Sequence, residues 1–160
     1  MKKLTKVFSV FFTALLLASE AVLGTSAQKA SAAPAPKLTQ LEIIGCSTPE
    51  IYNYDNRHLI IPIESLSSGK FTGSTIYVAT HQMGYGQLSF SVDGGAYQRA
   101  NEIDRFYING FDSNGVRAVV GWNVVSQISG LSAGQHTIRV LGISTVGGGT
   151  MSDAVTVTVG

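Results

Sequence analysis

Apolar and polar residues alternate along most of the chain beyond residue 37, which is the pattern of β-strands that bury one face. The clearest run places Leu88, Phe90 and Val92 on one side and polar residues on the other. It leads directly into residues 93–95, Asp-Gly-Gly, and because aspartate and glycine tolerate positive φ, this triplet favours a tight hairpin turn. Residues 96–99 are therefore expected to return as the partner strand.

The same alternation predicts strands elsewhere. Residues 38–46 and 74–81 form two of them, the second with Ile76 and Val78 pointing inward. Residues 58–64 form another, at a sheet edge because Pro62 has no N–H to donate. Three more strand faces are apolar and rich in β-branched residues: Val116, Ala118, Val120, Trp122 and Val124; Ile138 and Val140; and Val155, Val157 and Val159. No helical period of useful length is found beyond residue 37, so the domain is expected to be all-β.

The first residues have a different pattern, that of a secretory signal peptide. Lysines open the chain, an apolar run covers residues 7–18, and Ala-Ser-Ala ends the segment at Ala32. The apolar run is too short to span a bilayer comfortably, since roughly 20 residues are needed. We predict a signal peptide over residues 1–32, with cleavage near Ala27 as the alternative, a Pro/Ala linker over residues 33–37 and one domain over residues 38–160. The protein is therefore expected to be secreted and to have no membrane contact after cleavage.

Removal of the signal peptide changes the charge balance. Four lysines and Glu20 leave with it, so that 7 of the 11 basic and 9 of the 10 acidic residues remain, a net charge of −2. No basic stripe is left to follow a phosphate backbone, so nucleic-acid binding is not expected. Cys46 is the single cysteine, which excludes an internal disulfide. The residues before it resemble a lipobox, but polar residues separate them from the apolar run, which favours a buried structural thiol.

Short strands separated by turns favour a sandwich or a barrel. Residues 90–97 resemble the central hairpin of bacterial immunoglobulin-like and fibronectin type III-like domains, and residues 128–140 resemble the corner between their two sheets. The resemblance covers about residues 86–160 and implies a single antiparallel, immunoglobulin-like β-sandwich. It also implies that Leu131 closes the end of the core and that His136 stands where a tyrosine often bonds nearby backbone. Such sandwiches serve many unrelated functions.

Residues 38–87 are similar to the YolA-like family of small secreted Bacillus proteins. The likeness rests on residues 41–44, 76–80 and 84–86. It implies secretion and small size, and no activity.

No motif for catalysis or cofactor binding is present in the sequence. Residues 112–114 lack the glycine frame of a nucleophile elbow, and the three histidines lie on different predicted strands without metal-ligand spacing. We therefore expect no enzyme activity, no cofactor and no metal site. Residues 112–115 resemble a fragment of a calcium loop, although they are also ordinary turn formers. An ion held jointly by Glu102, Asp104 and Asp112 stays an open alternative.

Aromatic residues are the best candidates for binding. Tyr52, Tyr54 and Tyr85 have polar or glycine-rich neighbours, and exposed tyrosines can stack on sugar rings or fill a partner's pocket. The alternative is that they cover the ends of the sandwich. Trp122 shares a strand face with valines and is assigned to the core. Three further aromatic residues fit either a core or a surface position: Phe106, Tyr107 and Phe111.

The leading interpretation is a secreted, non-catalytic binding domain that recognises an extracellular polysaccharide or a cell-surface protein through loops bearing tyrosines. One alternative is a structural component of the extracellular matrix that self-associates through an exposed strand edge such as residues 58–64. Another alternative is a small extracellular hydrolase or an enzyme inhibitor.

Overall fold

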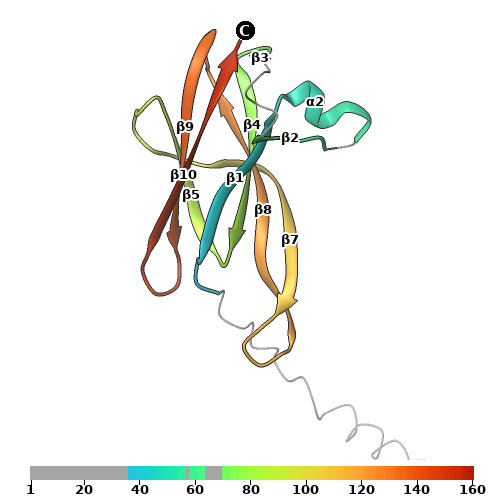
Figure 1. Cartoon of the computed structure of the whole chain (residues 1–160), viewed down its shortest axis with the longest axis vertical. Helices are drawn as coiled ribbons and strands as arrows, with labels where there is room; N and C mark the ends of the chain where they lie inside the picture. Colours follow the sequence, from blue (N-terminus) through green and yellow to red (C-terminus); the bar gives the residue numbers. More distant parts are fainter. Residues whose placement is uncertain (1–35, 57, 64–69) are drawn as a thin grey trace, which may run out of the picture. The chain divides into compact units, whose positions relative to one another are not determined.

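The alternating strands form two sheets with the apolar residues between them. The computed structural model describes residues 36–56, 58–63 and 70–160 (Figure 1). Its elements are β1 (Gln40–Ser47), α2 (Pro49–Asn53), a 3-10 turn (Tyr54–Asn56), β2 (Ile61–Pro62), β3 (Lys70–Phe71), β4 (Thr75–Met83), β5 (Gly86–Val92), β6 (Gln98–Arg99), β7 (Asn101–Phe111), β8 (Arg117–Ser129), β9 (Gly134–Ser144) and β10 (Thr150–Val159). The predicted signal peptide and the linker residues 33–35 lie outside the described residues.

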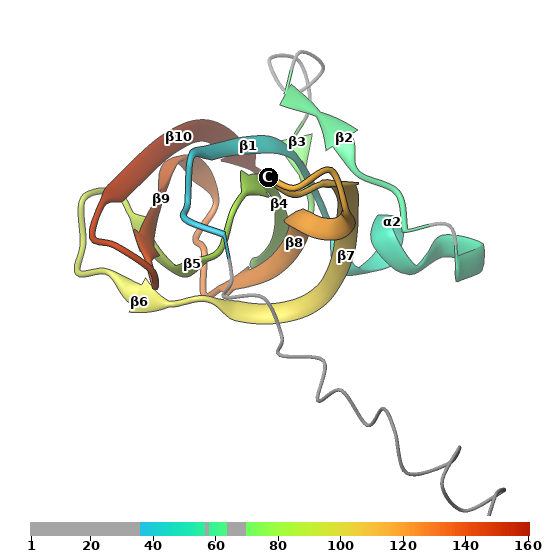
Figure 2. The ribbon, with the colours of Figure 1, turned by 90° about the horizontal axis from the view of Figure 1, so that it is seen from below.

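The first sheet has the strand order β2-β1-β4-β8-β7, and the second has the order β3-β10-β9-β5-β6. The long strands pair antiparallel, as predicted, but β3 pairs parallel with β10, so the second sheet is not wholly antiparallel. Figure 2 shows the segment β6–β7 passing from the second sheet to the first along one side. No helix in the described ranges is long and apolar enough to cross a membrane.

The core consists of the side chains that each strand turns inward. Ile76, Val78, Ile138 and Val140 have no exposed surface, and Val155 and Val157 are also buried, so the predicted inward faces are confirmed. Burying one such side chain stabilises a fold by about 1.5–3 kcal/mol. Cys46 is also buried and free, as predicted, and burial raises the pKa of its thiol to about 12.

The prediction of an all-strand domain missed one short helix, α2, after β1. Thr48 caps it, because its hydroxyl accepts a hydrogen bond from the Ile51 N–H at 3.3 Å. Pro49 follows the cap, in the first turn, where a missing N–H costs nothing. A Thr-Pro pair is therefore a start signal that the sequence did contain.

The strand predicted over residues 58–64 is mostly wrong. Only Ile61 and Pro62 pair with β1 among its described residues, and residue 64 lies outside them. His58 has a φ of 49°, which no extended strand allows. The predicted edge position of Pro62 is confirmed, since β2 ends the first sheet.

The hairpin after β5 forms as predicted, but its return strand is short. Asp93 and Gly94 have φ values of 50° and 75°, which close the tight turn. Only Gln98 and Arg99 of residues 96–99 then pair with β5. Residues 95–97 lie outside the sheet, and the Ser91 hydroxyl donates a hydrogen bond to the Gly95 carbonyl oxygen at 2.6 Å.

The apolar face predicted for β8 is only partly buried. Val124 is buried and Trp122 is half-buried against the core, whereas Val116 precedes the strand and is 59% exposed. β4 ends opposite Gly121, so residues 117–119 pair with β7 alone, and Val120 lies at a register shift between β7 and β8. The first residues of β8 therefore extend beyond the end of β4, and only β7 lies beside them.

Candidate functional site

Tyr52, one of the predicted binding residues, is buried instead of exposed. It lies on α2, is 3% exposed, and packs with Ala79 on the outer face of the first sheet. The Tyr77 ring meets it edge to face at 5.4 Å between centroids. Its hydroxyl donates to the Asp104 carboxylate at 2.7 Å, and burial, reinforced by this bond, raises the pKa of Tyr52. A ring enclosed in this way cannot stack on a ligand, so this prediction is wrong.

Tyr54 and Tyr85 lie at opposite ends of the first sheet. Tyr54 follows α2, is 60% exposed, and lies near the end of β1, where Ser47 pairs with Tyr77. Tyr85 follows the other end of β4, where Met83 pairs with the first residue of β1, and is half-buried. The three predicted tyrosines therefore do not form one site.

Leu131 and His136, predicted as structural residues, lie at the connection between β8 and β9. Leu131 is buried in the core. The two ring nitrogens of His136 lie 2.7 Å from an Asp93 carboxylate oxygen and 2.8 Å from the Ser132 carbonyl oxygen. Both neighbours are acceptors, so the doubly protonated ring satisfies both. The bond to Asp93, and then that to Ser132, raises the pKa of His136, and the same bond lowers the pKa of Asp93.

The three carboxylates considered for a shared ion are held apart. Glu102 pairs with Arg105, and Asp104 accepts from Tyr52. Asp112 accepts the N–H groups of residues 114 and 116 within its own turn. No three His, Cys, Asp or Glu side chains gather as metal ligands in the described ranges, so this alternative is wrong.

A different group of side chains, which we name the aromatic cluster, forms beside β7. It consists of Tyr85, Trp122, Arg105 and Glu102. The rings of Tyr85 and Trp122 meet edge to face at 5.2 Å. The Arg105 guanidinium lies 5.6 Å from the Tyr85 ring centroid and 6.0 Å from that of Trp122. Glu102 holds this guanidinium through both oxygens, one of them 2.7 Å from Nε, and raises the pKa of Arg105.

Tyr107 extends the aromatic cluster towards solvent. It pairs directly with Trp122 across β7 and β8, and paired residues share one face of a sheet. Tyr107 is 70% exposed, because β7 is the last strand of its sheet. Alternation along β7 could have placed Arg105 and Tyr107 on one face, but Tyr85 comes from a turn far away in the sequence.

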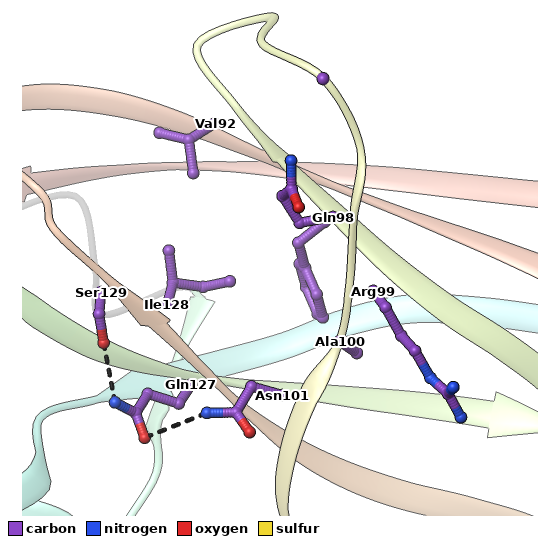
Figure 3. Close-up of a pocket in the computed structure, with 10 residues that line it drawn as sticks. Val92, Gln98, Arg99, Ala100, Asn101, Gln127, Ile128 and Ser129 are labelled. Atoms are coloured by element: carbon purple, nitrogen blue, oxygen red, sulfur yellow. Dashed lines mark hydrogen bonds between the residues drawn. The ribbon is translucent and has the colours of Figure 1, made fainter.

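A cavity of about 380 Å³, which we name the edge cavity, opens at the start of β7 (Figure 3). It lies between β5 and β6 of the second sheet and the end of β8 in the first. Its lining comprises Phe90, Val92, Ala96, Gln98, Arg99, Ala100, Asn101, Gln127, Ile128 and Ser129. The side chain of Arg99 points away from Val92 and Ile128 in Figure 3, so its guanidinium is not aimed into the cavity.

The edge cavity and the aromatic cluster both lie along β7. Asn101 lines the cavity, Glu102 and Arg105 belong to the cluster, and Tyr107 follows two residues later. At about 3.3 Å per residue, Asn101 and Tyr107 are separated by about 20 Å. The two surfaces therefore lie within about 20 Å of each other along one strand.

The chain was compared with models of known protein families. Residues 33–157 match the family described as a domain of unknown function (DUF4879). The chain belongs to the DUF4879 family. The matched residues include the aromatic cluster and the edge cavity, so both surfaces lie within the DUF4879 region. Searches of curated proteins and of solved structures each found no match.

Proposed function

We propose that the protein is a secreted, non-catalytic binding domain that holds an uncharged, extended glycan against the aromatic cluster. The observation that carries the proposal is the contact of Tyr85, Trp122 and Arg105 beside the exposed Tyr107. Aromatic rings present apolar faces that suit the C–H faces of sugar rings, while the phenol and guanidinium groups supply donors for hydroxyls.

The order of the strands supports an immunoglobulin-like sandwich as the framework. The order β1-β4-β8-β7 corresponds to strands A, B, E and D of an immunoglobulin constant domain. The order β10-β9-β5 corresponds to strands G, F and C. In such domains, binding residues are carried by a rigid pair of sheets, which costs little entropy when a ligand binds.

The pairing of charges favours a neutral ligand. Both carboxylate oxygens of Glu102 face Arg105, so the aromatic cluster presents no uncompensated charge. This ion pair also fixes the guanidinium plane beside the Tyr85 ring. An anionic or cationic polymer would have to compete with the ion pair, whereas a neutral glycan would not.

The engagement of nearby carboxylates supports binding over catalysis. Glycoside hydrolysis generally uses two carboxyl groups on either side of the scissile bond. Glu102 is committed to Arg105, and Asp104 accepts a hydrogen bond from Tyr52 on the outer face of the sheet. This arrangement suits a surface that holds a polymer without cleaving it.

Fluorescence provides a direct test, because Trp122 is the only tryptophan in the chain. The purified protein is titrated with neutral oligosaccharides such as cellohexaose and maltohexaose, and binding is expected to change the Trp122 emission. Tyr107→Ala is expected to weaken binding roughly tenfold, the usual effect of removing one aromatic anchor. Tyr54→Ala is the matched control, an exposed tyrosine at the other end of the sheet, and is expected to change nothing.

Two results would contradict the proposal. One is unchanged Trp122 emission with every neutral glycan while circular dichroism shows folded protein. The other is equal loss of affinity in Tyr107→Ala and Tyr54→Ala, since a specific site cannot depend equally on both ends of the sheet.

Self-association is a second candidate function, favoured by the length of β7 as an edge strand. β7 has 11 residues and ends the first sheet, and Phe106 and Phe111 are exposed on it. β2, the edge predicted from sequence, has only 2 residues. Long edges with exposed apolar residues promote pairing between chains. Sedimentation over a range of protein concentrations tests self-association. If the protein is a monomer at every concentration and Phe106→Lys sediments in the same way, this second candidate function is excluded.

A further inference from the structure

The edge cavity has the size of a single ligand unit. Its volume of about 380 Å³ lies near the lower limit for small-molecule pockets, which is about 300 Å³. It therefore suits one sugar residue or a group of similar size, and the rest of a longer ligand would lie outside it.

The floor of the cavity is apolar and uncharged. Phe90, Val92 and Ile128 come from the inner faces of the two sheets, and Ala96 and Ala100 add methyl groups. Arg99 pairs with Ser89, whereas Gln98 pairs with Phe90, so the side chains of Gln98 and Arg99 lie on opposite faces of β6. No charged side chain is directed at the floor from the described residues that line the cavity.

The carboxamide of Gln98 lies on the same face as this floor, because Gln98 pairs with Phe90. The carboxamides of Asn101 and Gln127 lie on the other face of the first sheet, because Gln127 precedes Ile128 in β8. Gln98 makes no hydrogen bond to another described side chain. Asn101 Nδ2 reaches Gln127 Oε1 only at 3.5 Å, a long contact. Gln127 gives one of its two N–H donors to Ser129 Oγ at 2.8 Å. The Gln98 amide therefore keeps its donors and its acceptor for a ligand in the cavity, whereas Asn101 and Gln127 contact each other and Ser129 on the outer face.

We propose that the edge cavity binds the acetamido group of an N-acetylated sugar. An acetamido group carries a methyl group, one N–H donor and one C=O acceptor. The methyl group matches the floor of Phe90, Val92 and Ile128, and the polar atoms match the amide of Gln98, which shares the face of Phe90. A hydroxyl at the same position would leave the floor unfilled, and a carboxylate would find no cation directed into the cavity.

The proposal rests on the proposed glycan function and narrows it. One polymer can place an acetamido group in the edge cavity and a sugar ring beside Tyr107, because the two lie about 20 Å apart along β7. The glycan class is therefore one that carries N-acetyl groups, and binding by the aromatic cluster alone would not require them.

The test compares N-acetylglucosamine with glucose, followed by the NMR signals of the Ala96 and Ala100 methyl groups in the purified protein. We expect shifts with N-acetylglucosamine at concentrations roughly tenfold or more below those needed with glucose, because a missing methyl group and amide typically cost that much. Ala100→Leu fills the cavity and is expected to abolish the shift of the Ala96 methyl group, the reporter that this variant keeps. Ala154→Leu, at an exposed position on β10, is the matched control and is expected to leave them unchanged.

Gln98→Ala keeps the test decisive if Ala100→Leu does not fold. This variant loses the exposed amide without a change to the core. Its affinity for N-acetylglucosamine is expected to fall roughly tenfold, the usual effect of removing one hydrogen-bonding partner from a site. The same proteins are also titrated with chitohexaose, the N-acetylated counterpart of cellohexaose, and binding is followed by the emission of Trp122.

The outcomes separate the two proposals. Equal shifts with glucose and N-acetylglucosamine, or none with either, overturn the acetamido site. In that case the proposed function is still supported if cellohexaose changes the Trp122 emission. If no glycan changes the emission, both the acetamido site and the proposed function are refuted. Tighter binding of an extended acetylated peptide than of chitohexaose, abolished by Ala100→Leu, would also overturn the proposal.

Discussion

Gln82 is a fully buried polar residue among apolar neighbours in the first sheet. It has no exposed surface, and it pairs across the sheet with Leu41 on β1 and Trp122 on β8. Neither its amide nitrogen nor its amide oxygen has a hydrogen-bonding partner within the described residues. A buried amide without a partner has lost its hydrogen bonds to water and gained nothing in exchange.

Replacement of Gln82 by methionine is therefore expected to stabilise the protein. The two side chains are similar in length, so Gln82→Met removes the amide with little change in volume. Removing an unsatisfied buried polar group is expected to raise the free energy of unfolding by about 1–3 kcal/mol. With a urea dependence of about 1–3 kcal/mol per M for a small domain, the unfolding midpoint should rise by roughly 1 M.

Equilibrium unfolding in urea, followed by the emission of Trp122, measures the effect. Thr80→Val is the matched control, because Thr80 is equally buried two residues earlier and its hydroxyl donates to the Val124 carbonyl at 3.2 Å. This variant loses a formed hydrogen bond and is expected to be destabilised by about 0.5–1.5 kcal/mol. A Gln82→Met variant less stable than the wild type would refute the reasoning, since the amide would then have a partner such as a buried water.

Three further predictions follow from single contacts. The raised pKa of His136 and the lowered pKa of Asp93 mean that their pair stabilises the fold most between the ordinary pKa values of 3.8 and 6.5. The melting temperature should fall as the pH rises through the raised pKa of His136, and again as it falls through the lowered pKa of Asp93. His136→Gln should flatten both changes in thermal scans, and an unchanged profile would contradict this. The Cys46 thiol, with its pKa of about 12, should resist a thiol reagent at pH 8 until urea unfolds the protein, and fast labelling in the absence of urea would exclude burial. Gly84→Ala would place a Cβ 1.9 Å from a backbone oxygen and should lower the urea midpoint far more than Gly73→Ala. Gly73 also has a positive φ but has open space around it, so its substitution should cost only about 1–2 kcal/mol.

The inward and outward faces of the strands could be predicted from the sequence, because the alternation of apolar and polar residues is a local property. Ile138, Val140, Val155 and Val157 point inward as predicted, and the turn at Asp93 has the positive φ that its sequence favours. The missed helix α2 was also encoded locally, in the cap and the proline that start it. The strand over residues 58–64 was overestimated because a strand also depends on a partner, and only two of its described residues find one.

The candidate site could not be predicted from local sequence patterns in the same way. Tyr52 and Tyr54 have similar polar neighbours in the sequence, yet Tyr52 is buried and donates a hydrogen bond to Asp104, whereas Tyr54 is exposed. Their difference comes from the packing of α2 on the first sheet. Trp122 was correctly placed on an inward face, but its contact with Tyr85 makes it part of a surface cluster.

The sequence by itself determined the all-β class, the inward faces of the strands and the position of the main turns, because each depends on residues within a few positions of one another. Only the tertiary structure decided that Tyr85, Arg105 and Trp122 meet, that Gln82 is enclosed without a partner, and that a cavity opens beside β6. These features depend on which strands become neighbours and on where one sheet ends before the other. That outcome is set by the packing of the whole domain, and no local pattern along the chain encodes it.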